Sequence, residues 1–186
     1  LAQRNDLDIR LVTTEATCSV DCDPRRVHRI VRNLIDNAVE HGDFHGVDVS
    51  VAQNDEAVAV SVRDFGVGLR PGESALVFNR FWRADPARAR TTGGTGLGLA
   101  ISLEDARLHG GWLEAWGEPG QGACFRLTLP RDRAVGFAES PLPLEPVDVE
   151  LDEGDSDLEP IADERHDMVT GVDPGDTPRD DDDDAV

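Results

Sequence analysis

Hydrophobic periodicity switches several times between the values typical of strands and helices, and the order of these switches restricts the fold. Alternating apolar residues predict strands over 9–12, 47–51, 58–62, 112–116 and 123–129. Helical spacing predicts one helix over 25–41 and another over 97–109. The resulting order is strand, helix, strand, strand, helix, strand, strand. Because this order lacks regular βαβ units, it predicts an α+β sandwich.

The first helix carries the clearest end signals. Asp23 is a suitable N-cap, Pro24 suits the first helical position, and Gly42 can end the helix. One apolar stripe recurs at helical spacing and consists of Val27, Ile30, Val31, Leu34, Ile35 and Ala38. This stripe predicts that the helix is buried along one side.

Charge and periodicity both change after Pro130. Residues 131–186 contain 20 acidic residues against 4 Arg, and their sequence shows no hydrophobic period. Low hydrophobicity combined with high like charge does not offset the entropy lost on ordering. We therefore expect a domain over 1–130 and an acidic, Pro- and Asp-rich disordered tail over 131–186. The predicted domain has a net charge of only −4, which does not suggest direct nucleic-acid binding.

All 18 basic residues are Arg, and the absence of Lys excludes two kinds of phosphate site. P-loops and eukaryotic-type protein kinases each use a Lys on the nucleotide phosphates. Phosphate chemistry in this chain must therefore rely on backbone amides, Arg and metal.

The cysteines and the apolar runs indicate neither a metal site nor a membrane span. Cys18, Cys22 and Cys124 lack the spacing of a zinc site, and we interpret them as reduced thiols. No apolar run approaches the roughly 20 residues of a transmembrane helix. Since the sequence begins with Leu1, we expect it to be a fragment of a longer protein.

Three polar side chains share one face of the first predicted helix. Asn33, Asn37 and His41 are spaced i, i+4, i+8 beside the apolar stripe. Asn is mildly disfavoured inside a helix, so two of them in register call for an explanation. A carboxamide oxygen is a suitable ligand for Mg²⁺. Surface decoration or capping is the alternative reading.

A second cluster, Asp64-Phe65-Gly66-Val67-Gly68, ends a predicted strand. Asp64 is in phase with the inward-facing Val60 and Val62, so we expect it to be buried. A buried carboxylate is unfavourable unless it accepts hydrogen bonds, and an adenine amino group is one suitable donor. Gly66 and Gly68 would let the backbone turn sharply or approach a ring closely. A simple Asp-containing turn remains possible on these residues alone.

Two further clusters follow. The segment 78–83 is aromatic and basic, and it could equally form a small satellite core. The glycine-rich segment 93–99 directly precedes the second predicted helix, where backbone N–H groups and the helix dipole favour a phosphate. The long connection between the second and last clusters is typical of a lid and contains Arg80, Arg83, Arg88 and Arg90.

Taken in order, the four clusters resemble the N, G1, F and G2 boxes of the histidine-kinase-type ATPases, the Bergerat or GHKL superfamily. The resemblance covers about 7–130. A narrower resemblance, to one actinobacterial type of sensor kinase, rests on residues 81–86 and 104–109. The family implies a two-layer α/β sandwich of the Bergerat type, with a mixed sheet packed on helices and a flexible ATP lid.

The resemblance also implies roles for individual residues. Asn37 would coordinate Mg²⁺, Asn33 would act catalytically near the phosphates, and Asp64 would accept from the adenine amino group. The other implied ATP-binding residues are His41, Gly66, Gly68, Arg83, Gly94, Thr95, Gly96, Leu97 and Gly98. Two positions depart from the family pattern, since many relatives carry Tyr in place of His41 and a basic residue in place of Glu40.

The residue at position 33 distinguishes this chain from the hydrolysing members of this family. Hydrolysing relatives carry Glu where this chain has Asn33, and a carboxamide cannot accept a proton from water. The resemblance therefore implies a protein-histidine kinase that binds ATP and Mg²⁺ and presents the γ-phosphate to a His of a dimerisation domain. The phosphoryl group would then pass to an Asp of a cognate response regulator in two-component signalling.

The resemblance also sets expectations for the parent protein. We expect a homodimer anchored in the plasma membrane, with this portion in the cytoplasm. The chain's five histidines, His28, His41, His45, His109 and His166, all lack the context of the family's phosphoacceptor, so we expect no autophosphorylation by this chain. An anti-sigma-factor-type serine kinase and a non-catalytic ATP-sensing module of the same fold are the alternatives.

Overall fold

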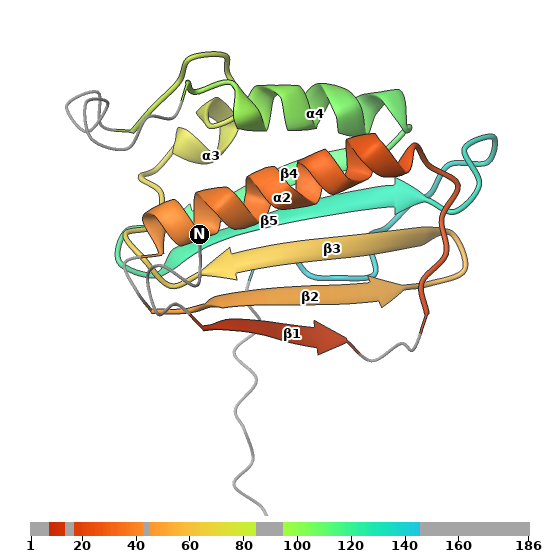
Figure 1. The fold of residues 1–186 in the computed structure, drawn as a ribbon, viewed down its shortest axis with the longest axis horizontal. Coiled ribbons are helices and arrows are strands. Elements are labelled where there is room, and N and C mark those ends of the chain that lie inside the picture. The colour runs from red at the N-terminus through yellow and green to blue at the C-terminus, as the bar shows by residue number, and fades with distance from the viewer. Residues whose placement is uncertain (1–7, 14–16, 43–44, 85–94, 146–186) are drawn as a thin grey trace, which may run out of the picture. The chain divides into compact units, whose positions relative to one another are not determined.

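The computed structural model describes residues 8–13, 17–42, 45–84 and 95–145 (Figure 1). The chain divides into a compact unit, Leu1–Asp148, and a second unit, Val149–Val186. All described residues belong to the first unit. The predicted disordered segment from 146 onward lies outside the described residues.

Five strands form one mixed sheet, and two long helices lie on one of its faces (Figure 1). The elements in chain order are β1 (Ile9–Thr13), α2 (Pro24–His41), β2 (Val47–Gln53), β3 (Ala57–Asp64), α3 (Glu73–Leu76), α4 (Gly98–Leu108), β4 (Trp112–Glu118) and β5 (Gly122–Pro130). The sheet order is β1-β2-β3-β5-β4, in which β1 and β2 are parallel and the other pairs are antiparallel. The predicted α+β sandwich is confirmed.

The predicted elements correspond closely to the observed ones. Asp23 caps α2 by accepting from the backbone N–H groups of Arg25 and Arg26, as expected. Gly42 ends α2 with a right-handed φ of −72° and donates its N–H to Ala38 O. The short helix α3 was not predicted, because a single turn shows no hydrophobic period.

The core lies between the helical layer and the sheet. Ile30 and Leu34 of α2 are fully buried against the inward-facing residues of the central strands. Cross-strand pairing places these inward residues opposite one another, as Val62 with Phe125 and Val60 with Leu127. Because this alternation continues along β3, Asp64 also points toward the helices.

The chain continues past β5 and contacts the sheet face that lies opposite the helices. Since Leu127 and Leu129 face the helices, Arg126 and Thr128 point to this outer face. Segment 131–145 makes one ring contact at 4.3 Å and two hydrogen bonds there, which pair Trp112 with Phe137, Thr128 with Ser140, and Arg126 with the carbonyl of Leu142. The compact unit therefore extends beyond Pro130, the end predicted for the domain from the loss of periodicity.

Polar contacts at three levels join α2 to α4, and we call them the polar ladder. The first level is the Asp23 backbone N–H, which donates to His109 Nε2 at 3.0 Å. The second is the buried Asp105 carboxylate, which accepts from Arg26 at 2.7 Å and from Arg29 Nε at 2.8 Å. Burial alone would raise the pKa of Asp105, but the bonds from these arginines outweigh it and the pKa is lowered.

The third level of the polar ladder joins Asn33 to the first turn of α4. Asn33 Nδ2 donates to Gly98 O at 3.1 Å and to Ser102 Oγ at 3.0 Å. The levels run from Asp23 to Asn33 along α2 and from His109 back to Gly98 along α4. The two helices are therefore antiparallel, and the middle of α2 lies beside the N-terminus of α4.

Replacing Asp105 with alanine is expected to lower the free energy of unfolding by about 2–3 kcal/mol. Breaking a buried ion pair from one side typically costs about 3–5 kcal/mol. The expected loss is smaller here because the Arg26 and Arg29 side chains are 43% and 49% exposed, so water can solvate them. Urea denaturation measures the change. Glu104→Ala, which removes the neighbouring exposed carboxylate, is the control, and equal effects of the two substitutions would contradict this role.

Candidate functional site

Asp64 occupies the end of β3 and is almost completely buried, with 1% of its surface exposed. Its Oδ1 accepts from the backbone N–H groups of Gly66 at 3.0 Å and Ala123 at 3.3 Å. Its Oδ2 is also buried but has no hydrogen-bond partner among the described residues. Burial raises the pKa of this carboxyl, while the two backbone N–H groups act in the opposite direction. The site therefore holds a buried acceptor to which the described residues supply no donor.

Three glycines allow the backbone to close around Asp64. A Cβ at Gly66 would lie 1.9 Å from His41 O, and a Cβ at Gly68 would lie 1.8 Å from Glu118 O. A Cβ at Gly122 would lie 2.0 Å from the carbonyl oxygen of Asp64 itself. The end of α2, the turn after β3 and the β4–β5 turn therefore meet at van der Waals contact, which only residues without a Cβ permit.

The polar face of α2 leads from the polar ladder toward this carboxylate. Asn33, Asn37 and His41 are all half-buried and lie one turn apart. Asn33 is engaged with α4, whereas no described residue hydrogen-bonds to the Asn37 carboxamide. His41 is close enough to Asp64 for its charge to favour the ionised carboxylate slightly. Along α2, Asn37 therefore lies between Asn33, which contacts the N-terminus of α4, and His41, which lies near Asp64.

The N-terminus of α4 presents backbone donors without a side-chain cap. Leu97 occupies the N-cap position and makes no capping hydrogen bond through its side chain. Gly96 has a φ of +67°, which favours glycine, and its carbonyl accepts from Phe81 N–H at 2.9 Å. Thr95 is exposed just before it. Uncapped N–H groups at a helix N-terminus suit an anion. Gly94, also expected to bind phosphate, lies outside the described residues.

Arg83 lies against the end of α2 at the start of the predicted lid. Its guanidinium is 3.8 Å from the Glu40 carboxylate, one turn beyond Asn37. The backbone of Phe81, two residues earlier, has a φ of +64°. The expected lid residues 85–94 lie outside the described residues.

The structure brings most of the predicted site residues to one end of the helical layer, but their roles toward a nucleotide stay predictions. Sequence reasoning missed two participants. The Ala123 N–H reaches Asp64 because β5 pairs with β3, and the sequence alone does not reveal that pairing. Ser102 occupies an ordinary helical position in the sequence. Gly122, directly before Ala123, was the sequence signal that could have indicated the role of Ala123. No sequence signal indicated the role of Ser102.

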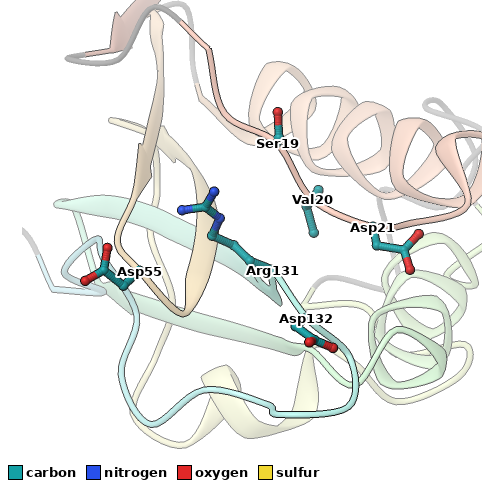
Figure 2. A pocket seen from close by; sticks show the side chains of 6 residues that line it. All are labelled: Ser19, Val20, Asp21, Asp55, Arg131 and Asp132. Carbon is teal, nitrogen blue, oxygen red and sulfur yellow. The ribbon is translucent and has the colours of Figure 1, made fainter.

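A separate hollow of about 520 Å³ lies at the other end of β3 (Figure 2). Its lining comes from the segment before α2, the β2–β3 turn and the end of β5, and includes Asp21, Asp55, Arg131 and Asp132. Three carboxylates around one guanidinium do not suit a triphosphate. Because the eight residues of β3 separate this hollow from Asp64, it is not part of the candidate site.

The described residues contain neither a candidate membrane span nor a candidate cluster of metal ligands. None of their helices is both long and apolar enough to cross a membrane. They also contain no group of three or more His, Cys, Asp or Glu side chains that could hold a metal ion.

The family described as histidine kinase-, DNA gyrase B- and HSP90-like ATPases matches residues 22–133. Among curated proteins, the sensor histidine kinase MtrB of Mycobacterium leprae is 63% identical over 127 residues, which are 68% of this chain and 23% of that protein. MtrB of Mycobacterium tuberculosis H37Rv is 56% identical over 147 residues, which are 79% of this chain and 26% of that protein. The chain thus spans about a quarter of the length of the curated relatives it matches. The narrower resemblance inferred from sequence is to this MtrB type, and it is confirmed.

Solved structures show the same fold. Full-length ShkA in complex with AMPPNP is 30% identical, with a TM-score of 0.61, and the match covers 76% of this chain and 28% of that one. The mycobacterial sensor histidine kinase MprB is 29% identical, with a TM-score of 0.57, and the match covers 69% of this chain and 85% of that one. The two-layer α/β sandwich expected for this family is confirmed.

Proposed function

Since this chain belongs to the family of histidine kinase-, DNA gyrase B- and HSP90-like ATPases, we propose that it is the catalytic, ATP-binding domain of a sensor histidine kinase. Its task is to present the γ-phosphate of ATP to a His on a dimerisation domain outside this chain. A response regulator Asp then receives the phosphoryl group. The identity with MtrB-type kinases over most of the described residues supports this reading.

The buried Oδ2 of Asp64 is the observation that carries the proposal. A buried carboxylate oxygen with no donor among the described residues is unfavourable, and backbone atoms pack closely around it at Gly66, Gly68 and Gly122. The exocyclic amino group of adenine supplies the missing donor. Gly66 and Gly68 would shape the turn beside it by allowing close backbone packing. Asp64 thus selects a purine that carries an amino group.

The phosphates would bind along the N-terminus of α4. The N–H groups around Gly96, Leu97 and Gly98 point out of the helix end and carry the positive end of its dipole. Arg83, beside Glu40, would approach from the lid side. Together they replace the Lys that the sequence lacks.

The donor set fits Mg²⁺. Mg²⁺ usually binds through one or two protein oxygens together with substrate phosphates and waters. The Asn37 carboxamide is such an oxygen donor, and it lies beside the N-terminus of α4, where the phosphates would bind. When bound, the metal would neutralise phosphate charge during transfer.

Asn33 favours transfer to another group over hydrolysis. Its amide donors are engaged by Gly98 and Ser102, and a carboxamide has no basic lone pair to activate water. Asn33 therefore contributes by positioning, and the nucleophile comes from the dimerisation domain. We further propose that the parent kinase is a membrane-anchored homodimer and that this domain lies in its cytoplasmic portion.

Calorimetric titration with ATP, with and without MgCl₂, tests the proposal. The chain is expected to bind ATP more tightly with Mg²⁺, and Asn37→Ala should weaken this Mg²⁺ dependence roughly 10- to 100-fold. Asp36→Ala, on the same helix and partly exposed, should leave it unchanged and is the control. With labelled ATP, phosphohistidine should form on an added MtrB-type phosphoacceptor domain and not on this chain. A chain that is folded but binds no ATP would exclude the proposed function.

A further inference from the structure

Ser102 places a fully buried hydroxyl in the interface between α2 and α4. None of its surface is exposed, and its neighbours Ala100 and Ala106 on the buried side of α4 are apolar. Its Oγ–H donates to Gly98 O at 2.9 Å, and the same oxygen accepts from Asn33 Nδ2 at 3.0 Å. The hydroxyl therefore has both a donor and an acceptor within the interface between α2 and α4.

The direction of these bonds fixes the orientation of the Asn33 side chain. Gly98 O can only accept, and the Ser102 hydroxyl already spends its proton on that carbonyl. Both partners therefore require the NH₂ group of Asn33, and its carbonyl oxygen takes part in neither bond. The hydroxyl of a helical serine can donate to the carbonyl four residues earlier without any further partner. Ser102 therefore does not depend on Asn33 for its hydrogen bond, whereas the Asn33 side chain is oriented by this contact.

This contact lies between the two halves of the proposed nucleotide site. Gly98 begins the helix whose N–H groups face the phosphates, and Asn37 follows Asn33 by one turn along α2. A shift of α4 relative to α2 would change the distance between the metal ligand and the phosphate donors. Resting on the function proposed above, we propose that Ser102 is a positioning residue that couples the Mg²⁺ ligand on α2 to the phosphate-binding end of α4.

Ser102→Ala tests this coupling without adding volume to the core. ATP affinity is measured by calorimetry with and without MgCl₂, and thermal unfolding is recorded in parallel. The Mg²⁺-dependent gain in affinity is expected to fall about 2- to 12-fold, the range that corresponds to one net hydrogen bond. Ser61→Ala removes a similarly buried hydroxyl from the outer face of β3 and should leave this gain unchanged.

A double-mutant cycle with Asn33→Ala identifies the path of the effect. Because both substitutions break the same contact, their effects on the Mg²⁺-dependent gain should be clearly less than additive. Additive effects, or a Ser102→Ala chain that melts earlier but keeps the unmodified Mg²⁺ dependence, would overturn the positioning role and leave the proposed function intact. No ATP binding by the folded unmodified chain would overturn both.

Discussion

Asp64→Asn is expected to weaken ATP binding by about 10- to 150-fold while leaving the ligand-free domain at least as stable as before. A hydrogen bond to a charged group contributes about 1.5–3 kcal/mol, which corresponds to that change. In asparagine the Oδ1 acceptor keeps the bonds from Gly66 and Ala123, but an NH₂ group replaces the unpartnered Oδ2. This NH₂ would face the adenine amino group, so a donor would meet a donor.

Asp64→Asn is not expected to lower the free energy of unfolding of the ligand-free domain, although it weakens ATP binding. Burial raises the pKa of Asp64, so the folded chain holds this proton more tightly than the unfolded chain does. The contribution of this group to stability therefore falls as pH rises through its folded pKa, and at neutral pH it is unfavourable. Asparagine removes that unfavourable charge. Weaker binding without lower stability is the pattern expected of a residue kept for its ligand.

Calorimetry and urea denaturation of the same samples measure both quantities. In the unmodified chain, ATP affinity should also decline as pH falls through the pKa of Asp64, because the protonated carboxyl no longer offers two acceptor oxygens. Asp48→Asn on the outer face of β2 is the control and should change neither ATP affinity nor its pH dependence. Unchanged ATP affinity in Asp64→Asn would remove adenine from the proposed role of this carboxylate.

Gly68→Ala is expected to destabilise the domain by about 4 kcal/mol or more, at the upper end of single substitutions. The left-handed φ of +71° alone costs an L-residue about 1–2 kcal/mol. The added Cβ would also lie 1.8 Å from Glu118 O and 2.7 Å from its carbonyl carbon. Since these are backbone atoms, the turn after β3 would have to separate from the β4–β5 turn, which would open the wall around Asp64.

Gly72→Ala separates the two causes. Gly72 has a φ of +85°, but a Cβ added there would meet no other atom within 4 Å. This substitution should therefore cost only the roughly 1–2 kcal/mol of the backbone conformation. Thermal and urea unfolding compare the two variants. Equal destabilisation would show that the close approach to Glu118 contributes nothing.

Local signals predicted most of the fold, and tertiary contacts account for what they missed. Alternation along β3 predicted the burial of Asp64, and the caps of α2 predicted its ends. The outer-face segment 131–145 was not predicted as ordered, because it contacts the sheet through single residues such as Phe137 and Ser140 rather than through a repeating pattern. The acidic composition of 131–186, taken as a whole, gave no sign that residues 131–145 contact the sheet.

In the candidate site, too, local signals predicted one part of the arrangement and tertiary contacts account for the rest. The residue types and order of the four clusters predicted which residues gather, since strand ends, helix faces and glycine turns are local properties. The partners of Asn33 were not predictable, because they depend on how α4 crosses α2. The resemblance implied that Asn33 lies near the phosphates, which stays a prediction, and the structure adds that its NH₂ group donates to Gly98 and Ser102.

The polar ladder also determines which helical register is allowed. Apart from Asp105, the buried residues of α4 are the small Ala100, Ser102 and Ala106, whose shape alone specifies a register weakly. Each level of the polar ladder uses a different chemistry, and a slip of one turn, about 5.4 Å, would mismatch all three. Because Arg26 and Arg29 are one turn apart on α2, such a slip would leave at most one of them able to reach Asp105. The alignment of α2 with α4 is therefore specified by polar groups, two levels of which lie outside the candidate site, as buried polar residues specify register in coiled coils.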